Sequence, residues 1–328
     1  MSAPPPRAEL LADRGAAAES GEFFRSREFL DAEGVTHTLR IAGDGDDLRV
    51  PLIVREIGDG PERDAISPYG YPGVAILPGA PDIDRTGAGS TSDALLDPAA
   101  INFSDAGLVS AFVRHALAEP PFAGASERNV VQIADPALPA KTRGSDRNQI
   151  NKNLRRGYEV RIVPGPETTA DERAGFLAAY EQTMRRTGAA ERYFFGAAYF
   201  DRLLESDRTW LATALAPGGE VAAASIAAAS DGYLHYYLSG SADPHLRDSP
   251  MKNVVSALVE HAASLGLPLN LGGGISRGDR LEEFKRGFAN RELPWRSSEI
   301  VCDPAAYARL SAGHEAGEFF PAYRAPRT

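Results

Sequence analysis

The sequence predicts an α+β fold in which mixed, twisted sheets are flanked by helices. In the first half, polar and apolar residues alternate from Thr36 to Ile57 around an Asp/Gly turn, which is the pattern of a β-hairpin. The second half opens with helical periodicity, continues with three strand-like segments, and closes as helix, strand, helix and strand. Segregated helices and strands of this kind are typical of α+β proteins.

Length and composition are those of an ordinary globular chain. The 328 residues, 43% of them hydrophobic, are enough for two domains whose cores need neither disulfides nor metals. The single cysteine, Cys302, is interpreted as a small buried side chain rather than a nucleophile, and it fits a reducing compartment. Since the N-terminus shows no apolar signal core and no membrane-spanning stretch, we expect a cytoplasmic protein.

The elements of the first half follow from local composition. Residues 1–20 are rich in Pro, Ala and charge, and are expected to form a flexible lead-in. Prolines and glycines in ISPYGYPGVAI (66–76) predict an irregular loop. The apolar spacing in residues 104–117 predicts a helix, and NVVQIA (129–134) predicts a buried strand.

The second half is predicted with clearer boundaries. A helix begins at Thr169, whose acidic first turn suits a helix N-terminus, and another is expected within 191–207. Ser-Pro and Gly bracket a third helix over 249–266. The remaining expected elements are strands over 209–216, 220–230, 233–241 and 267–271, a short helix over 280–288, and a last strand ending at Cys302.

The segment 141–161 differs from the rest of the chain in charge. It holds seven basic residues against two acidic ones, although the whole chain has a formal net charge of -10. A helix over 147–156 would bring Lys152, Arg155 and Arg156 close together before Gly157 ends it. The pattern fits a solvated helical face and an anion-binding patch equally well. The net negative charge of the chain argues only against nonspecific binding along nucleic acid.

Four blocks together resemble the FemABX group of the GNAT superfamily. They are SPYGYPG (67–73), RNQINKNLRRGYEV (147–160), FLAAYEQTMRRTGAAERYFFGAAYF (176–200), and the series YLHYYLSGS, LGGG and FKRGF between 233 and 288. The resemblance implies two GNAT-like domains, over 21–165 and 166–310, and a C-terminal tail over 311–328. It places an active cleft at a split sheet in the second domain. Members of this group attach amino acids to amines, using aminoacyl-tRNA as the donor.

One loop departs from ordinary acetyltransferases of this fold. In those enzymes a glycine-rich turn precedes a helix, and its backbone N–H groups hold the pyrophosphate of coenzyme A. Here the turn reads HLRDSPMKN (245–253), with no glycine, an acidic Asp248, and Pro250, which lacks an N–H group. We therefore expect no bound cofactor, with aminoacyl-tRNA as co-substrate. Acyl-CoA is the alternative donor.

Transfer from an activated ester needs positioning and a cation near the developing oxyanion. The Phe284-Lys285 pair matches the family's FK motif, which implies a functional Lys285, although a surface helix lysine is the plain alternative. Tyr236 and Tyr237 alternate on a strand, so one is expected to face the cleft and contact the carbonyl. His235 could serve as a base, but a strand histidine is more often structural.

Substrate contacts are expected elsewhere on the chain. We assign Tyr69 and Tyr71 to the acceptor groove, and Arg185 to an acidic or phosphate part of the acceptor. Phe284, Lys152, Arg155 and Arg156 complete the predicted substrate-binding set. The six scattered histidines show no metal-binding spacing, so no metal is expected.

The sequence therefore favours an aminoacyltransferase that acts on a peptidoglycan precursor or a small amine metabolite. The nearest alternative is a GNAT N-acetyltransferase that uses acyl-CoA. Such an enzyme would bind coenzyme A, and its activity would be insensitive to RNase. A further alternative is a binding protein that keeps the cleft without turnover, in which case Lys285→Ala would change no rate.

Overall fold

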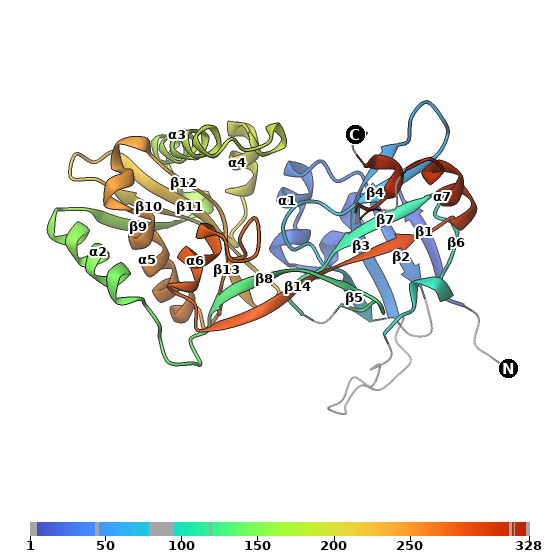
Figure 1. Cartoon of the computed structure of the whole chain (residues 1–328), viewed down its shortest axis with the longest axis horizontal. Coiled ribbons are helices and arrows are strands. Elements are labelled where there is room, and N and C mark those ends of the chain that lie inside the picture. The colour runs from blue at the N-terminus through green and yellow to red at the C-terminus, as the bar shows by residue number, and fades with distance from the viewer. Residues whose placement is uncertain are drawn as a thin grey trace. The chain divides into compact units, whose positions relative to one another are not determined.

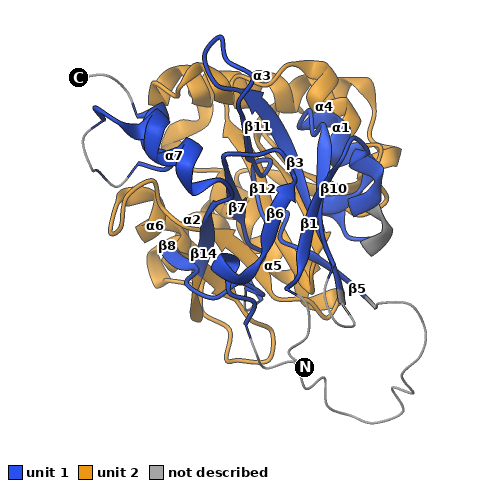
Figure 2. Cartoon of the chain, turned by 90° about the vertical axis from the view of Figure 1, so that its right-hand side faces the viewer, with its two compact units in different colours: residues 1–128, 295–328 blue, residues 129–294 orange. Residues whose placement is uncertain are grey.

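The computed structural model describes residues 5–42, 46–78, 95–118, 120–314, 317 and 319–325. The chain forms two compact units: unit 1 holds residues 1–128 and 295–328, and unit 2 holds residues 129–294 (Figure 2). Two strands, β8 (Ser126–Ala134) and β14 (Arg291–Val301), each run from one unit into the other.

These units differ from the domains expected at 21–165 and 166–310. Residues 144–164 belong to unit 2, because their helix packs on a later helix and their strand pairs with β10 (Thr209–Leu215). The lead-in is partly ordered, since β1 (Arg7–Leu11) pairs with β2 (His37–Ala42). The tail also packs on unit 1, where Arg324 contacts the buried Asp64 at 2.5 Å.

Unit 1 is built around a mixed sheet whose strands lie in the order β6, β1, β2, β3, β4, β7 and β14. The hairpin predicted from the alternating pattern is confirmed, because β2 and β3 (Asp46–Glu56) pair antiparallel. The turn itself lies largely outside the described residues. The remaining elements are β4 (Arg63–Ile66), β5 (Ala75–Pro78), β6 (Asn102–Asp105), β7 (Ser110–Arg114), α1 (Arg27–Ala32) and α7 (Pro304–Ser311).

The helix predicted over residues 104–117 is wrong. Gly107 turns the chain with φ +60°, and β7 follows, paired with β4 on one side and β14 on the other. Ala111 and Val113 enter the core, while Phe112 between them is partly exposed, as strand alternation requires. The helical spacing of the apolar residues was outweighed by hydrogen bonds to strands that are distant in sequence.

Unit 2 contains a sheet in the order β8, β13, β12, β11, β10 and β9. Only β12 and β13 pair in parallel; every other pair of neighbours among these described strands is antiparallel. Figure 1 shows α3 and α4 on one face and α5 on the other. Their bounds are β9 (Glu159–Pro164), β11 (Val221–Ser230), β12 (Tyr233–Ser241), β13 (Leu269–Gly272), α2 (Gly144–Arg155), α3 (Ala170–Thr187), α4 (Ala197–Leu203), α5 (Met251–Ser264) and α6 (Arg280–Arg286).

Helix α3 lies very close to the sheet because small residues face it. A Cβ at Gly240 of β12 would lie 2.5 Å from the carbonyl oxygen of Ala179. A Cβ at Gly175 of α3 would likewise lie 2.5 Å from Val221 of β11. The predicted start of α3 is confirmed, since Thr169 forms a reciprocal capping box with Glu172.

The helix predicted over 249–266 is also confirmed as α5, and its apolar face packs into the core of unit 2 through Val254, Val255 and Leu258.

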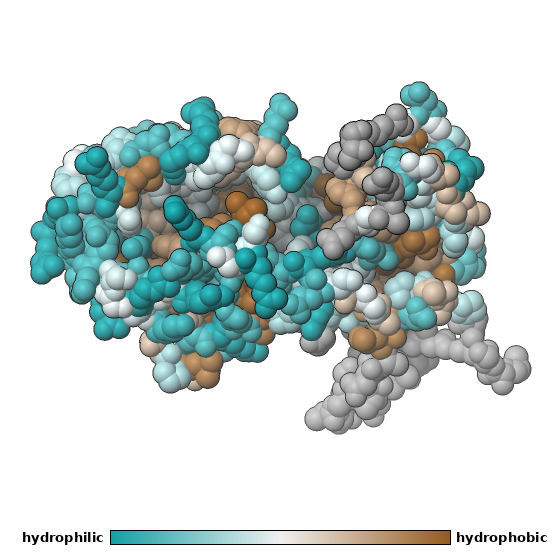
Figure 3. Space-filling model, in the orientation of Figure 1, coloured by the Kyte–Doolittle hydropathy of each residue, from teal (hydrophilic) through white to brown (hydrophobic). Residues whose placement is uncertain are grey.

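Hydrophilic residues predominate on the molecular face drawn in Figure 3, and apolar ones are scattered. Among the described residues, no helix combines the length and the apolar character needed to cross a membrane.

Candidate functional site

The sheet of unit 2 splits between its two parallel strands. β12 and β13 pair only at Leu234 with Leu269 and at His235 with Asn270. Beyond this point β12 stays paired with β11 as far as Ser241, whereas β13 stays paired with β8. The two strands therefore diverge at the position where the family resemblance places its cleft.

A β-bulge lies immediately after the split. Ile226 of β11 pairs with Leu238 and the next residue, Ala227, pairs with Tyr236, so Tyr237 is the extra residue of β12. Bulges redirect a side chain and are common beside active sites. The bulge therefore separates the roles of the two tyrosines.

Tyr236 belongs to the packing of unit 2. Its ring lies against the core, its hydroxyl donates to Ser239 Oγ at 2.6 Å, and burial raises the pKa of Tyr236 to about 12. Tyr237 has its hydroxyl 3.4 Å from that of Tyr199, at the start of α4. The Tyr199 ring stacks on Phe195 with centroids 4.0 Å apart. Tyr237 thus joins an aromatic group with Tyr199 and Phe195, two residues that the sequence analysis had not assigned to the site.

His235 is held as a neutral structural residue. It is 1% exposed; its Nε2 donates to the Ser230 carbonyl at 3.1 Å, and its Nδ1 accepts from Asn270 Nδ2 at 3.0 Å. Burial lowers the pKa of His235 to about 4. With both ring nitrogens engaged, the geometry favours the structural interpretation over a general base.

Lys285 is buried rather than exposed on its helix. Only 8% of the residue is exposed, and Nζ donates to the carbonyl oxygen of Gly273 at 2.6 Å. Burial lowers the pKa of Lys285 to about 8, because the ammonium loses solvation. Gly273 has no room for a side chain, since a Cβ would lie 2.7 Å from the Val130 carbonyl oxygen. The glycine turn therefore brings a polar carbonyl to this amine.

Phe284, the neighbour of Lys285, packs against the core with its ring 5.7 Å from that of Phe288.

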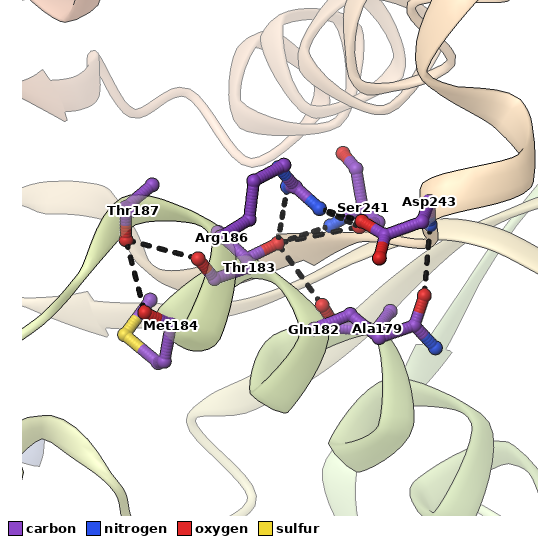
Figure 4. A network of polar contacts seen from close by, with 8 residues as sticks. All are labelled: Ala179, Gln182, Thr183, Met184, Arg186, Thr187, Ser241 and Asp243. Atoms are coloured by element: carbon purple, nitrogen blue, oxygen red, sulfur yellow. Dashed lines mark hydrogen bonds and ion pairs between the residues drawn. The ribbon is translucent and has the colours of Figure 1, made fainter.

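Arg185 lies exposed in the last turn of α3, where it pairs with Glu181 at 2.7 Å. The next residue, Arg186, instead reaches the Ser241 carbonyl at 3.3 Å and also pairs with Asp243 (Figure 4). Arg186 thus ties α3 to the end of β12, a role the sequence analysis missed.

The segment that leads into α5 is bound by side chains from α2 and from the residues after it. Asn153 of α2 donates to the Asp248 carbonyl at 2.7 Å and to Asn253 Oδ1 at 2.8 Å. The Asp248 carboxylate accepts from Arg156 at 2.6 Å and from Tyr158 at 3.0 Å. The amides of Lys252 and Asn253 already donate to the carbonyls of Ser249 and Pro250. Side chains of α2 and the residues that follow it therefore bind the segment that leads into α5, although no side chain caps the helix itself.

The predicted basic residues divide into two groups. Lys152 and Arg155 are exposed on α2, whereas Arg156 is committed to Asp248. The acidic side chain of α2, Asp146, is buried and pairs with Lys252 at 2.9 Å. The exposed face of α2 is therefore basic or neutral.

Tyr69 and Tyr71 lie in unit 1, whereas the other predicted site residues lie in unit 2. Arg114 lies 5.8 Å from the centroid of the Tyr69 ring. The Tyr71 ring contacts Phe24 and Trp295 at centroid distances of 5.7 and 6.3 Å.

Within the described part of the chain, no group of three or more His, Cys, Asp or Glu residues could hold a metal ion.

Comparison with known proteins identifies this region. Residues 140–286 match the family model of an acetyltransferase (GNAT) domain. The matched residues lie within unit 2 and include α2, Lys285, and the two strands β12 and β13 between which the sheet splits. A search of curated proteins found no match.

Solved structures extend the likeness beyond the GNAT domain. FemX superimposes with a TM-score of 0.58 at 9% identity, over 92% of this chain and 99% of that one. The C-terminal domain of a putative lysylphosphatidylglycerol synthetase from Agrobacterium fabrum gives 0.56 at 13% identity, over 90% and 93%. L-PGS from Bacillus licheniformis gives 0.44 at 14% identity, and the match spans 55% of this chain and 62% of that one. The first two likenesses confirm the predicted fold of two GNAT-like units.

Proposed function

We propose that this chain is an aminoacyltransferase, which moves an aminoacyl group from aminoacyl-tRNA to the amine of a peptidoglycan precursor or a small metabolite. The GNAT domain supports acyl transfer as the reaction class. The likeness to FemX supports the tRNA donor, because the FemABX group uses aminoacyl-tRNA.

One observation carries the choice of donor. The segment that leads into α5, where GNAT enzymes bind the coenzyme A pyrophosphate, carries Asp248. Its carbonyl is bound by Asn153, and its carboxylate is bound by Arg156 and Tyr158. The amides of Lys252 and Asn253 already donate to carbonyls within the turn, so they have no hydrogen bond left to offer a pyrophosphate. The segment 245–253 also contains no glycine that would let a phosphate approach the backbone closely. The donor is therefore bound by other contacts.

In the proposed reaction, the acceptor amine attacks the ester carbonyl carbon of the aminoacyl group. The C–O bond to the ribose breaks, an amide forms, and the proton lost by the amine ends on the ribose hydroxyl. Lys285 supplies positive charge near the developing oxyanion, since with a pKa of about 8 it is mostly protonated at pH 7. Tyr237 contacts the carbonyl or relays the proton, while Tyr236 and Phe284 support them through core packing.

The remaining residues are proposed to bind the two substrates. Lys152 and Arg155 contact donor phosphates from the exposed face of α2, and Arg156 acts through its ion pair with Asp248. Tyr69 and Tyr71 contact the acceptor. Arg185 is assigned to the acceptor with the least structural support, because its guanidinium is exposed and already pairs with Glu181.

The test is transfer of a labelled amino acid from a pool of aminoacyl-tRNAs to a metabolite extract, with and without RNase, beside a parallel acetyl-CoA reaction. We expect RNase-sensitive amide products, no measurable binding of coenzyme A, and a loss of about 100-fold or more in Lys285→Ala. Lys141→Ala, in the loop before α2, is the control and should retain activity. Product from acetyl-CoA alone would overturn the proposed donor.

The family model favours a second candidate, an N-acetyltransferase that uses acyl-CoA, because it is described as an acetyltransferase domain. That function requires coenzyme A to bind despite Asp248. Calorimetry of coenzyme A with the wild-type chain separates the two candidates directly.

A further inference from the structure

The loop between β13 and α6, residues 273–279, is closed by one carboxylate. Asp279 accepts three backbone hydrogen bonds, from Ile275 at 2.7 Å, Ser276 at 3.0 Å and Glu282 at 2.8 Å. It is also the N-cap residue of α6. Gly274 fits against it only as glycine, because a Cβ there would lie 2.8 Å from Asp279 Cγ. Asp279 thus determines the path of the loop.

The same loop presents the group that binds Lys285. The Gly273 carbonyl accepts from Lys285 Nζ at 2.6 Å, and the Gly274 carbonyl accepts from Asn129 of β8 at 2.9 Å. One side of the loop is therefore fixed by the sheet and the other by Asp279. The position of the ammonium group depends on both.

Asp279 also supplies charge. Its carboxylate is the charged group that favours the protonated form of Lys285, in opposition to burial. Arg277 of the loop and Arg280 of α6 are the other basic groups beside Asp279, and the remaining carboxylates around α6 form ion pairs. These pairs are Glu282 with Arg286, Glu283 with Arg143, Glu292 with Arg286, and Asp146 with Lys252.

We propose that Asp279 is the positioning residue for Lys285: its carboxylate closes the loop whose Gly273 carbonyl accepts from the buried amine, and the same contacts fix its negative charge at the start of the helix that carries that amine. The catalytic consequence rests on the proposed function of Lys285. The charge coupling itself does not, so the two can be tested separately.

The composition of the chain makes a direct measurement possible. The sequence contains four lysines, at positions 141, 152, 252 and 285. Protein grown with lysine labelled with ¹³C at Cε gives a spectrum simple enough to follow each amine, and Lys285→Met assigns the signal of Lys285. A pH titration of that signal reports the protonation of the amine without any substrate.

The decisive variant is Asp279→Asn, which removes the charge and retains an oxygen able to cap α6. We expect the Lys285 titration to move to lower pH by about half a unit, a threefold loss of proton affinity. The matched control is Glu283→Gln, which removes one carboxylate from the exposed side of the same helix and should leave the titration unchanged. An unchanged titration in Asp279→Asn, or an equal shift in both variants, overturns the proposal.

Asp279→Ser, a second neutral cap, guards against local disorder in the asparagine variant and should give the same shift. In the transfer assay, the pH dependence of kcat/KM in Asp279→Asn should move in the same direction as the spectrum. A shifted spectrum with an unshifted rate profile overturns the catalytic role of Asp279. If no transfer is found in any variant, the proposed function fails, while the titration still decides the charge coupling.

Discussion

At the scale of single residues, burial determines the protonation of two ionisable groups in unit 2. His235 and Lys285 are both almost fully buried, and burial lowers the pKa of both. His235 has a hydrogen-bond partner at each ring nitrogen and is neutral at pH 7. Lys285 has a carbonyl partner and stays mostly charged. Of these two buried side chains, only Lys285 therefore carries a positive charge at pH 7.

The buried amine makes stability depend on pH in a defined window. The pKa of Lys285 falls from 10.5 to about 8 on folding, so between these values the unfolded chain binds the proton that the folded chain has released. Wild-type stability should rise from pH 8 to 10.5, relative to Lys285→Met, by about 3 kcal/mol at 1.36 kcal/mol per pKa unit. Urea unfolding of both proteins across this range measures the difference. Parallel stability curves would show that the amine is not desolvated.

At the scale of elements, α2 and α5 act as one assembly. The side chain of Asn153 is fully buried and joins α2 to the Asp248 carbonyl and to Asn253. Arg156 and Tyr158 hold the Asp248 carboxylate from the same segment. The basic segment recognised in the sequence thus has an anchoring side and an exposed side.

Loss of the anchor should be costly. Asn153→Ala leaves the buried Asn253 Oδ1 without the donor from Asn153 and leaves the Asp248 carbonyl with Gln149 alone, so we expect a loss of about 2 kcal/mol in the free energy of unfolding. Asn151→Ala removes an exposed amide from the same helix and should change stability by less than about 0.5 kcal/mol. Urea denaturation gives both values. Equal effects of the two variants would contradict the anchoring role.

At the scale of the whole molecule, a chain with a net charge of -10 displays a locally basic helix. The acidic side chain of α2 is buried and paired, so it does not offset Lys152 and Arg155 at the surface. We therefore expect the exposed face of α2 to attract phosphates more strongly than the acidic chain does as a whole.

The salt dependence of donor binding tests this confinement. If Lys152 and Arg155 each neutralise one phosphate, replacing both with Gln should weaken tRNA binding and reduce the slope of log K against log salt by about 2. The control, Arg7→Gln with Arg309→Gln, removes the same charge from unit 1 and should leave the slope unchanged. Filter binding over a salt series measures it, and an unaltered slope in the α2 variant would exclude these phosphate contacts.

Local signals in the sequence were sufficient for much of the fold. Thr169 with Glu172, and the Ser-Pro and Gly around α5, define helix ends through contacts within a few residues. The hairpin of β2 and β3 and the charge of α2 likewise depend on neighbouring residues. These features could be predicted because their stabilising interactions are local.

The tertiary structure decided the features that depend on residues distant in sequence. Residues 110–114 became a strand because β4 and β14 pair with them from both sides, and the unit boundaries follow from the return of β14 to unit 1. The bulge at Tyr237, the ties of Asp248 and the contact of Lys285 with Gly273 join separate elements. A linear pattern can place these residues on elements, but only packing brings their polar groups within hydrogen-bonding distance of one another.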